Sequence, residues 1–252
     1  MKVHRILCEG PEDLVALREL AIHLFGATTV PTRGGGAGGM TREQRLQGTT
    51  ALVKLTVAKD AKSGLVREAM TALDAEPRRN RRDPNDQPLR RLGIVFDPDG
   101  DPRAKFENAV LTAFQTSAKE WRVRRLTSKR ACLLATRDRD RVLVHFVAWR
   151  STYALDTMPD VLNLERLLCE IAAEAYPAEA SIVARWLKDF PVGSLQHPWK
   201  AALHLWCALV EAKSDEHSAP ARFLHQNKTC APHVEPLLRS ISVLRELEPL
   251  LR

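Results

Sequence analysis

The chain has few cysteines and no long apolar run. Its 252 residues include only five cysteines, an odd number with wide spacing and no Cys-x-x-Cys pair. This pattern excludes a disulfide framework and a zinc cluster. No apolar run approaches the ~20 residues that a membrane-spanning helix needs, and no apolar segment of a signal peptide follows the first residues. We therefore expect a cytoplasmic protein without a membrane partner.

Two common catalytic signatures are also missing. The chain contains no Walker A segment, because its glycine-rich stretch at residues 34–39 lacks the Lys-Ser/Thr ending of a phosphate loop. We interpret that stretch as a flexible loop. No Ser/His/Asp constellation for nucleophilic catalysis is recognisable, and no internal repeat is visible.

What the chain does have is an excess of positive charge. Its length allows one large or two small domains, and it contains 38 Lys and Arg against 31 Asp and Glu, a net charge of +7. Such an excess favours a polyanionic partner, of which nucleic acid is the commonest.

An acidic segment follows a short apolar run in this basic chain. Residues 92–96 predict a buried strand, and Asp97, Asp99 and Asp101 follow at alternate positions among Pro and Gly. Carboxylates placed so closely repel one another, and Mg²⁺ is a hard cation that takes such oxygen ligands. The segment therefore predicts a metal site at the carboxyl edge of a sheet, with a solvated acidic turn as the alternative.

A second acidic segment lies near the start of the chain. Residues 2–8 predict a first strand, after which come Glu9-Gly10-Pro11 and a helix that ends at Gly26. Asp13 lies in the first turn of that helix, where compensation of the helix dipole is an alternative role. Glu9 has no evident structural need at the end of a buried strand.

Together these segments resemble the Toprim domain, which occurs in topoisomerases, primases, recombination-repair proteins and overcoming-lysogenization-defect (OLD) nucleases. Glu9 with Gly10 matches its first motif, Asp97 with Asp99 matches its second, and Asp13 matches the extra acid of the nuclease branch. The resemblance implies an α/β, Rossmann-like, mostly parallel sheet flanked by helices. It also implies that these carboxylates converge and bind one or two Mg²⁺ or Mn²⁺ ions, with Glu9 also catalytic.

The similarity extends to small stand-alone bacterial Toprim proteins akin to the OLD nucleases. These carry Met-Pro-Asp before a helix with Leu-Glu near its start, here residues 158–160 and then Leu164 with Glu165. The resemblance implies that Glu165 binds a second metal and that Lys200 is catalytic beside the metals. Two departures are Val161 and Asn163, where the relatives often have Asn and Gly. A surface lysine at a helix start is the alternative for Lys200.

The predicted organisation is a Toprim-like α/β domain over residues 1–175 and a helical extension over residues 176–252 that completes the site. A run of arginines precedes the acidic strand, and it is either a solvated loop or a surface that contacts nucleic acid. Its predicted nucleic-acid-binding members are Arg78, Arg79, Arg81, Arg82, Arg90 and Arg91.

Two functions follow from these features. The first is a Mg²⁺- or Mn²⁺-dependent nuclease, with DNA favoured over RNA, acting in antiphage defence or repair. The second is a non-catalytic Toprim module that binds nucleic acid or a partner ATPase. Because OLD nucleases fuse Toprim to an ATPase and this chain lacks a Walker A motif, the resemblance implies a separate ATPase partner. Topoisomerase activity is disfavoured, since the only tyrosines, Tyr153 and Tyr176, lie in no recognisable motif.

Overall fold

The structure is a computed structural model that describes residues 2–30, 43–80, 89–99, 103–117, 120–126, 133–138, 140–189, 195–213, 224 and 227–252. It divides into two compact units. The first comprises residues 1–96, 101–148 and 245–252, and the second comprises residues 97–100 and 149–244. This division differs from the expected boundary at residue 175, because the helix over residues 164–175 belongs to the second unit and the last residues return to the first.

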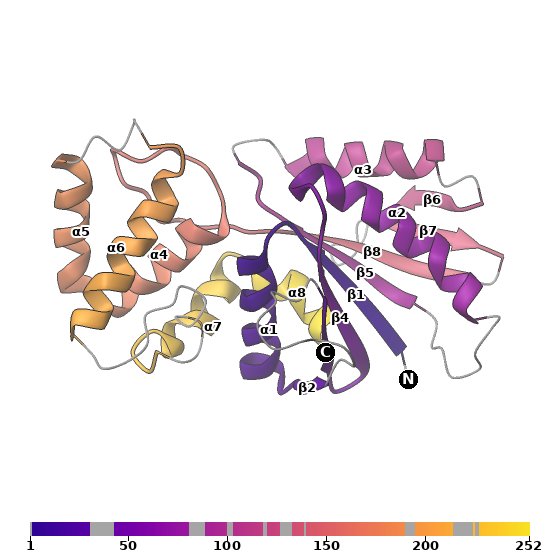
Figure 1. Ribbon diagram of the computed structural model, residues 1–252, viewed down its shortest axis with the longest axis horizontal. Helices are drawn as coiled ribbons and strands as arrows, with labels where there is room; N and C mark the ends of the chain where they lie inside the picture. The colour runs from indigo at the N-terminus through magenta and orange to yellow at the C-terminus, as the bar shows by residue number, and fades with distance from the viewer. Residues whose placement is uncertain are drawn as a thin grey trace. The chain divides into compact units, whose positions relative to one another are not determined.

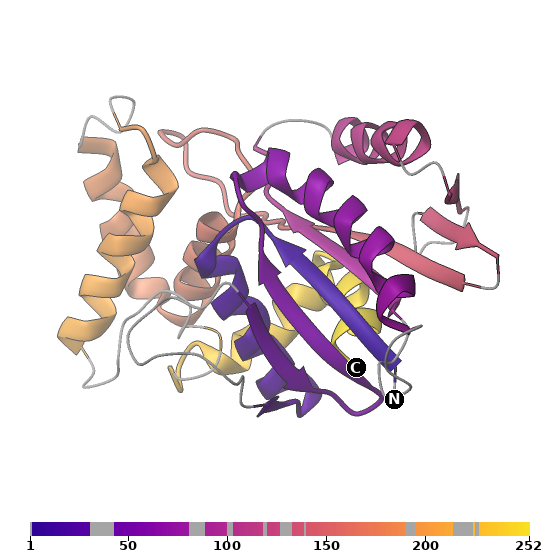
Figure 2. The same cartoon turned by 45° about the vertical axis from the view of Figure 1, so that its right-hand side comes forward.

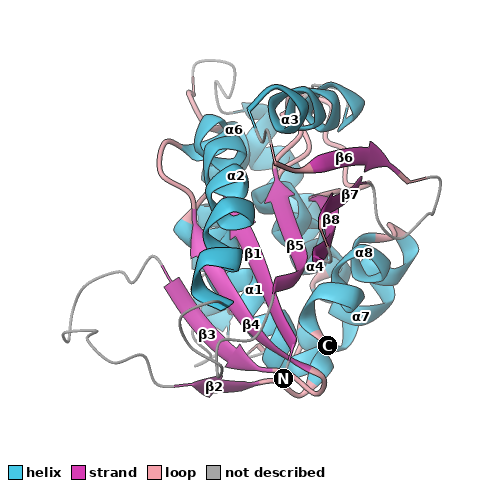
Figure 3. Cartoon of the chain, turned by 90° about the vertical axis from the view of Figure 1, so that its right-hand side faces the viewer, coloured by secondary structure: helices cyan, strands magenta, loops and turns pink. Residues whose placement is uncertain are grey.

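The first unit is built on a mixed sheet. Its described strands are β1 (Lys2–Cys8), β2 (Thr28–Val30), β3 (Glu43–Gln47), β4 (Ala51–Val57), β5 (Leu89–Phe96), β6 (Arg122–Arg125), β7 (Leu133–Arg137) and β8 (Asp140–Ala148). Their order is β2-β3-β4-β1-β5-β8-β7-β6 (Figure 3). The four central strands are parallel, and the outer pairs are antiparallel. This confirms the expected α/β, Rossmann-like class, with a parallel centre and antiparallel edges.

Helices cover both faces of this sheet. One face carries α2 (Ala61–Asn80) and α3 (Arg103–Ser117), and the other carries α1 (Pro11–Phe25) and the end of α8 (Val243–Leu251) (Figures 1 and 2). Leu92, Ile94 and Phe96 of β5 point to the first face and join a buried apolar core with α2 and α3. Gly93 points to the opposite face, where an added Cβ would lie only 2.7 Å from Leu250 Cδ1. The glycine therefore lets α8 pack closely on β5.

The ends of α1 follow from its sequence. Pro11 is the first helical residue, and the Asp13 carboxylate accepts a hydrogen bond from the Gly10 N–H at 2.8 Å. Gly26 adopts a left-handed conformation, with φ of 64°, and closes the helix. Both the expected start and the expected end of this helix are confirmed.

The second unit is helical. It contains α4 (Leu164–Ala175), α5 (Pro177–Asp189), α6 (Pro198–Lys213) and α7 (Ala231–Ser240), with α4 packed against the other three. The helical C-terminal part is thus confirmed. The apolar periodicity over residues 234–251 predicts one helix, but the structure has two, because Ser242 takes a left-handed φ of 66° and so interrupts the helical backbone. Among the described helices, none is both long and apolar enough to cross a bilayer.

Candidate functional site

Two acidic segments follow neighbouring parallel strands. The parallel strands β1 and β5 pair as far as Leu7 and Ile94, so both strands end at the same carboxyl edge of the sheet. Glu9 comes two residues after that pair, and Asp97 comes three residues after it. The carboxyl edge of a parallel sheet is where α/β proteins commonly bind ligands. The expected convergence of the Glu9 and Asp97 carboxylates itself stays a prediction.

In the first unit, Asp13 has a structural task. Its carboxylate is buried, with 6% of the residue exposed, and it accepts the Gly10 N–H at the start of α1. Burial, together with the charges of Asp13 and Glu9, raises the pKa of the Cys8 thiol above its ordinary value. Cys8 therefore stays protonated at neutral pH and is no candidate nucleophile. Asp13 was considered both as a metal ligand and as a residue that stabilises the start of α1, and the hydrogen bond from Gly10 supports the second role.

In the second unit, the loop after β5 is tied to the start of α4. Asp97 Oδ1 accepts a hydrogen bond from the Leu164 N–H at 3.1 Å. The Asp99 N–H donates to the Leu162 carbonyl at 3.4 Å. Asn163 is the N-cap of α4, and its side chain accepts the Arg166 N–H at 2.9 Å. The asparagine at position 163 therefore has a local role, since asparagine is among the best N-cap residues.

A buried arginine fixes the segment that precedes α4. Arg166 is 5% exposed and donates to the Tyr153 carbonyl at 2.6 Å and to the Val161 carbonyl at 3.0 Å. It also forms an ion pair of 2.6 Å with the exposed carboxylate of Asp160, and its guanidinium lies 5.3 Å from the centre of the Trp199 ring. One side chain thus joins residues 153–161 to α4 and to the start of α6.

These contacts surround a small pocket of about 240 Å³ in the second unit, which we call the acidic pocket. Asp99, Glu165 and Lys200 all line it. They come from three separate segments, namely the loop after β5, the first turn of α4 and the first turn of α6. The structure thus brings together three of the residues predicted for the site.

The acidic pocket supplies donors that suit a hard cation. Two carboxylates at an open pocket match the way Mg²⁺ is commonly held, by one or two carboxylates with the remaining positions taken by water and substrate phosphate. Within the described ranges, however, no three His, Cys, Asp or Glu side chains gather closely enough to form a metal cage. Asp99 and Glu165 would thus suit Mg²⁺ or Mn²⁺ with water in its remaining positions, whereas the described residues do not fit an ion enclosed by protein ligands.

Sequence reasoning missed part of this pocket. His197 and Trp199 also line it, and both lie within the His-Pro-Trp-Lys segment at the start of α6. Trp199 is buried, and its Nε1–H donates to the Pro159 carbonyl at 2.9 Å. In the sequence, only its position three residues before Lys200 indicates that His197 lines the same pocket.

The predicted basic run is divided. Arg78 and Arg79 lie at the end of α2, where the structure describes no side chains, and Arg81 and Arg82 lie outside the described residues. The remaining two, Arg90 and Arg91, belong to β5 and line a different pocket in the first unit.

Comparisons with known proteins inform the fold alone. No family model matches the chain, and no curated protein matches it. A crystal structure of a hypothetical protein from Pyrococcus horikoshii superposes with a TM-score of 0.62 at 13% sequence identity and covers 100% of both chains. The chain is thus similar in fold, over its full length, to this archaeal protein.

Proposed function

We propose that the protein is a metal-dependent nuclease whose reaction takes place at the acidic pocket of the second unit. The observation that carries the proposal is the shared lining of that pocket by Asp99, Glu165 and Lys200. Two carboxylates and one ammonium group are the side chains needed to bring a divalent cation and a phosphodiester together. The resemblance of the acidic segments to Toprim nucleases and the net charge of +7 support the same conclusion.

The chemistry assigned to each residue follows from its charge. Asp99 and Glu165 would hold Mg²⁺ or Mn²⁺ by their carboxylate oxygens. Such an ion, when bound, supplies an activated water and stabilises charge on the phosphate. Lys200 would neutralise negative charge that grows on the phosphate oxygens in the transition state. Asp97 orients the start of α4, and with it Glu165, through its hydrogen bond to Leu164.

Glu9 and Asp13 stay in the proposal as further acidic residues. Glu9 directly follows β1, which is a strand neighbouring β5, so it is the next candidate metal ligand and retains its predicted catalytic role. Asp13 already accepts a hydrogen bond at the start of α1, so a role for it would use the remaining carboxylate oxygen. We propose DNA ahead of RNA as substrate, and a separate ATPase as partner in a defence or repair setting.

A nuclease assay with purified variants tests the proposal. Single-stranded and duplex DNA and RNA are incubated with Mg²⁺ or Mn²⁺, and metal binding is followed separately by calorimetry. Asp99→Asn and Glu165→Gln should each lower activity by about 100-fold or more and weaken metal binding. Lys200→Ala should lower kcat by about 100- to 1,000-fold and leave metal affinity unchanged.

Matched controls distinguish the loss of a pocket residue from the loss of one charge anywhere on the surface. Asp156→Ala removes an exposed carboxylate, and Lys188→Ala an exposed ammonium group, and neither residue lines the acidic pocket. Both controls should retain wild-type activity. Unchanged cleavage by Asp99→Asn and Glu165→Gln would refute the assignment of the pocket.

The second candidate is a binding module without catalysis. Two observations favour it, namely the absence of a three-ligand metal group among the described residues and a strongly basic pocket in the first unit. Wild-type protein that binds nucleic acid and metal but cleaves none of the four substrates would support this candidate, unless an added ATPase partner restores cleavage.

A further inference from the structure

The first unit contains a larger pocket, which we call the basic pocket, of about 730 Å³. Six cationic side chains and one carboxylate line it. The cations are Lys2, Arg90, Arg91, Arg141, Arg245 and Arg252. The carboxylate, Glu248, is paired with Arg252 at 2.9 Å. The volume lies in the range typical of ligand sites, roughly 300–1,000 Å³.

A β-bulge explains why two consecutive arginines enter the same pocket. The pairing of β1 with β5 matches Val3 with Leu89 and then His4 with Arg91, so Arg90 is one extra residue on β5. Leu89 and Leu92, three residues apart, both reach the core on the other face, whereas a regular strand would place them on opposite faces. The bulge thus directs both Arg90 and Arg91 to the pocket.

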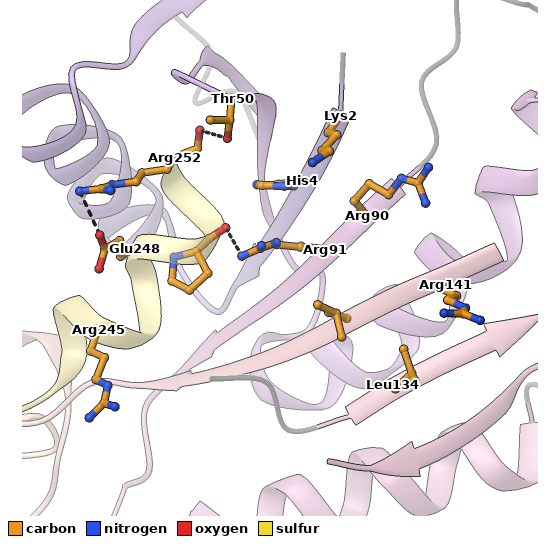
Figure 4. Close-up of a pocket in the computed structure, with 12 residues that line it drawn as sticks. Lys2, His4, Thr50, Arg90, Arg91, Leu134, Arg141, Arg245, Glu248 and Arg252 are labelled. Carbon is orange, nitrogen blue, oxygen red and sulfur yellow. Dashed lines mark hydrogen bonds and ion pairs between the residues drawn. The ribbon is translucent and has the colours of Figure 1, made fainter. Parts of the chain in front are cut away.

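The cations lie at the amino ends of three neighbouring strands. Lys2 begins β1, while Arg90 and Arg141 are each the second residue of their strands, β5 and β8 (Figure 4). Neighbouring strands are about 4.8 Å apart, so these side chains form a row of positive charges along the sheet edge. The helix α8 brings Arg245, its third residue, to the same pocket, and Arg252, which directly follows α8, lines it as well.

Several of these cations have no anionic partner among the residues that the structure describes. In the described parts of the chain, no carboxylate forms an ion pair with Lys2, Arg90, Arg141 or Arg245, and all four are exposed. Arg91 differs, because its Nη1 donates to the Pro249 carbonyl at 2.8 Å and so holds α8 against β5. Four charges therefore remain available for a bound anion, and Arg91 stabilises the wall of the pocket.

The composition of the lining limits the kind of anion. Its members include no Phe, Tyr or Trp on which a base could stack, and its one carboxylate already has a partner. The lining therefore offers many contacts to phosphate and few to a base or a ribose. A row of exposed cations also suits a polymer with repeated negative charge better than a single small anion.

We propose that the basic pocket binds the phosphodiester backbone of nucleic acid, without base specificity and without a metal ion. The inference deepens the proposed function, since it names where the substrate would be held outside the acidic pocket. The inference depends on the proposed nuclease function in one respect only, namely that nucleic acid, and not another phosphate-rich polymer, is the ligand. Backbone contacts of this kind are sequence-independent and sensitive to salt.

The test is fluorescence anisotropy with labelled duplex and single-stranded DNA in EDTA, so that no metal chemistry occurs. The variant Arg90→Ala/Arg141→Ala removes two exposed cations, and its thermal melt should match the wild type. Each phosphate contact contributes a salt slope of about −0.9 for duplex DNA, so at ~0.15 M salt the variant should bind about 30-fold more weakly. The slope of log affinity against log salt should become shallower by about 1.8.

The control is Arg185→Ala/Lys188→Ala, which removes two exposed charges on α5 and should change affinity by less than about threefold. Equal affinity losses in the two double variants would overturn the inference. Tripolyphosphate that binds as tightly as DNA would overturn nucleic acid as the occupant. The two proposals can fail separately. If the wild-type protein cleaves no nucleic acid but binds DNA, and Arg90→Ala/Arg141→Ala loses that binding, this inference is supported and the nuclease proposal fails.

Discussion

Replacement of Arg166 by alanine should strongly destabilise the second unit. The buried guanidinium makes two hydrogen bonds to the carbonyls of Tyr153 and Val161, and a bond from a charged donor contributes about 1.5–3 kcal/mol. The cation–π contact with Trp199 contributes about 1 kcal/mol or more. The Asp160 carboxylate is 93% exposed, so that ion pair contributes at most about 1 kcal/mol.

These contributions give an expected loss of at least about 4 kcal/mol for Arg166→Ala and of about 1 kcal/mol or less for Asp160→Ala. Urea unfolding followed by tryptophan fluorescence measures both losses, because four of the five tryptophans lie in residues 149–244. With an m-value of about 2 kcal/mol/M, the midpoint of Arg166→Ala should fall by about 2 M. Arg166→Lys should be intermediate, because lysine keeps the charge but lacks the planar fork.

The two variants separate two explanations of the same site. If the ion pair with Asp160 were the main contribution, Arg166→Ala and Asp160→Ala would lower the midpoint equally. That result would refute the assignment of Arg166 as the side chain that fixes residues 153–161. Pro159 and Val161 line the acidic pocket. Arg166→Lys should therefore also reduce nuclease activity, in proportion to the fall of its urea midpoint.

Three further predictions concern the first unit and the cysteines. Gly93→Ala should destabilise the protein by about 1–3 kcal/mol through overlap with Leu250, and a double-mutant cycle with Leu250→Ala should show a smaller loss than the sum of the two single losses. Burial is the main reason that the pKa of His4 lies below the ordinary histidine value of 6.5. As the pH falls, the unfolded state therefore binds the proton first, so the free energy of unfolding should be full above pH 6.5 and fall as the pH drops through the lowered pKa. In urea titrations at several pH values, His4→Gln should lose this dependence. A variant whose free energy of unfolding changes with pH as steeply as that of the wild type would contradict the prediction. Cys8, Cys169, Cys207 and Cys230 are buried, so a thiol reagent at neutral pH should modify them only as fast as the protein unfolds.

Local patterns in the sequence were sufficient for the fold class. The apolar run at residues 92–96, the Pro11 start and the Gly26 end of α1 each depend on interactions within a few residues, which is why β5 and α1 could be predicted. The break at Ser242 could not be predicted, because the apolar periodicity continues through it. The return of residues 245–252 to the sheet unit depends on contacts between segments that are far apart in sequence.

The assignment of the candidate site stays a prediction, but part of its lining could be foreseen. Chemistry and family resemblance singled out Asp99, Glu165 and Lys200, and all three line one pocket. The basic pocket was out of reach for two reasons. The bulge at Arg90 is a property of the pairing between two strands. Arg141 and Arg245 stand beside carboxylates in the sequence, at Asp140 and Glu246, and they reach the same pocket only because distant segments fold together.

The strand β1 has opposite charges at its two ends, so one strand can carry a basic group and an acidic group that do not neutralise each other. β1 begins at Lys2 and is followed by Glu9, so seven residues, or roughly 23 Å at 3.3 Å per residue, separate the two charges. At that distance their attraction in water is only about 0.2 kcal/mol, and the Debye length of ~8 Å at physiological salt screens even that. Neither end therefore neutralises the other. An anionic polymer at the basic pocket should therefore bind independently of the charge at Glu9, so Glu9→Gln and wild-type protein should have equal DNA affinity in EDTA.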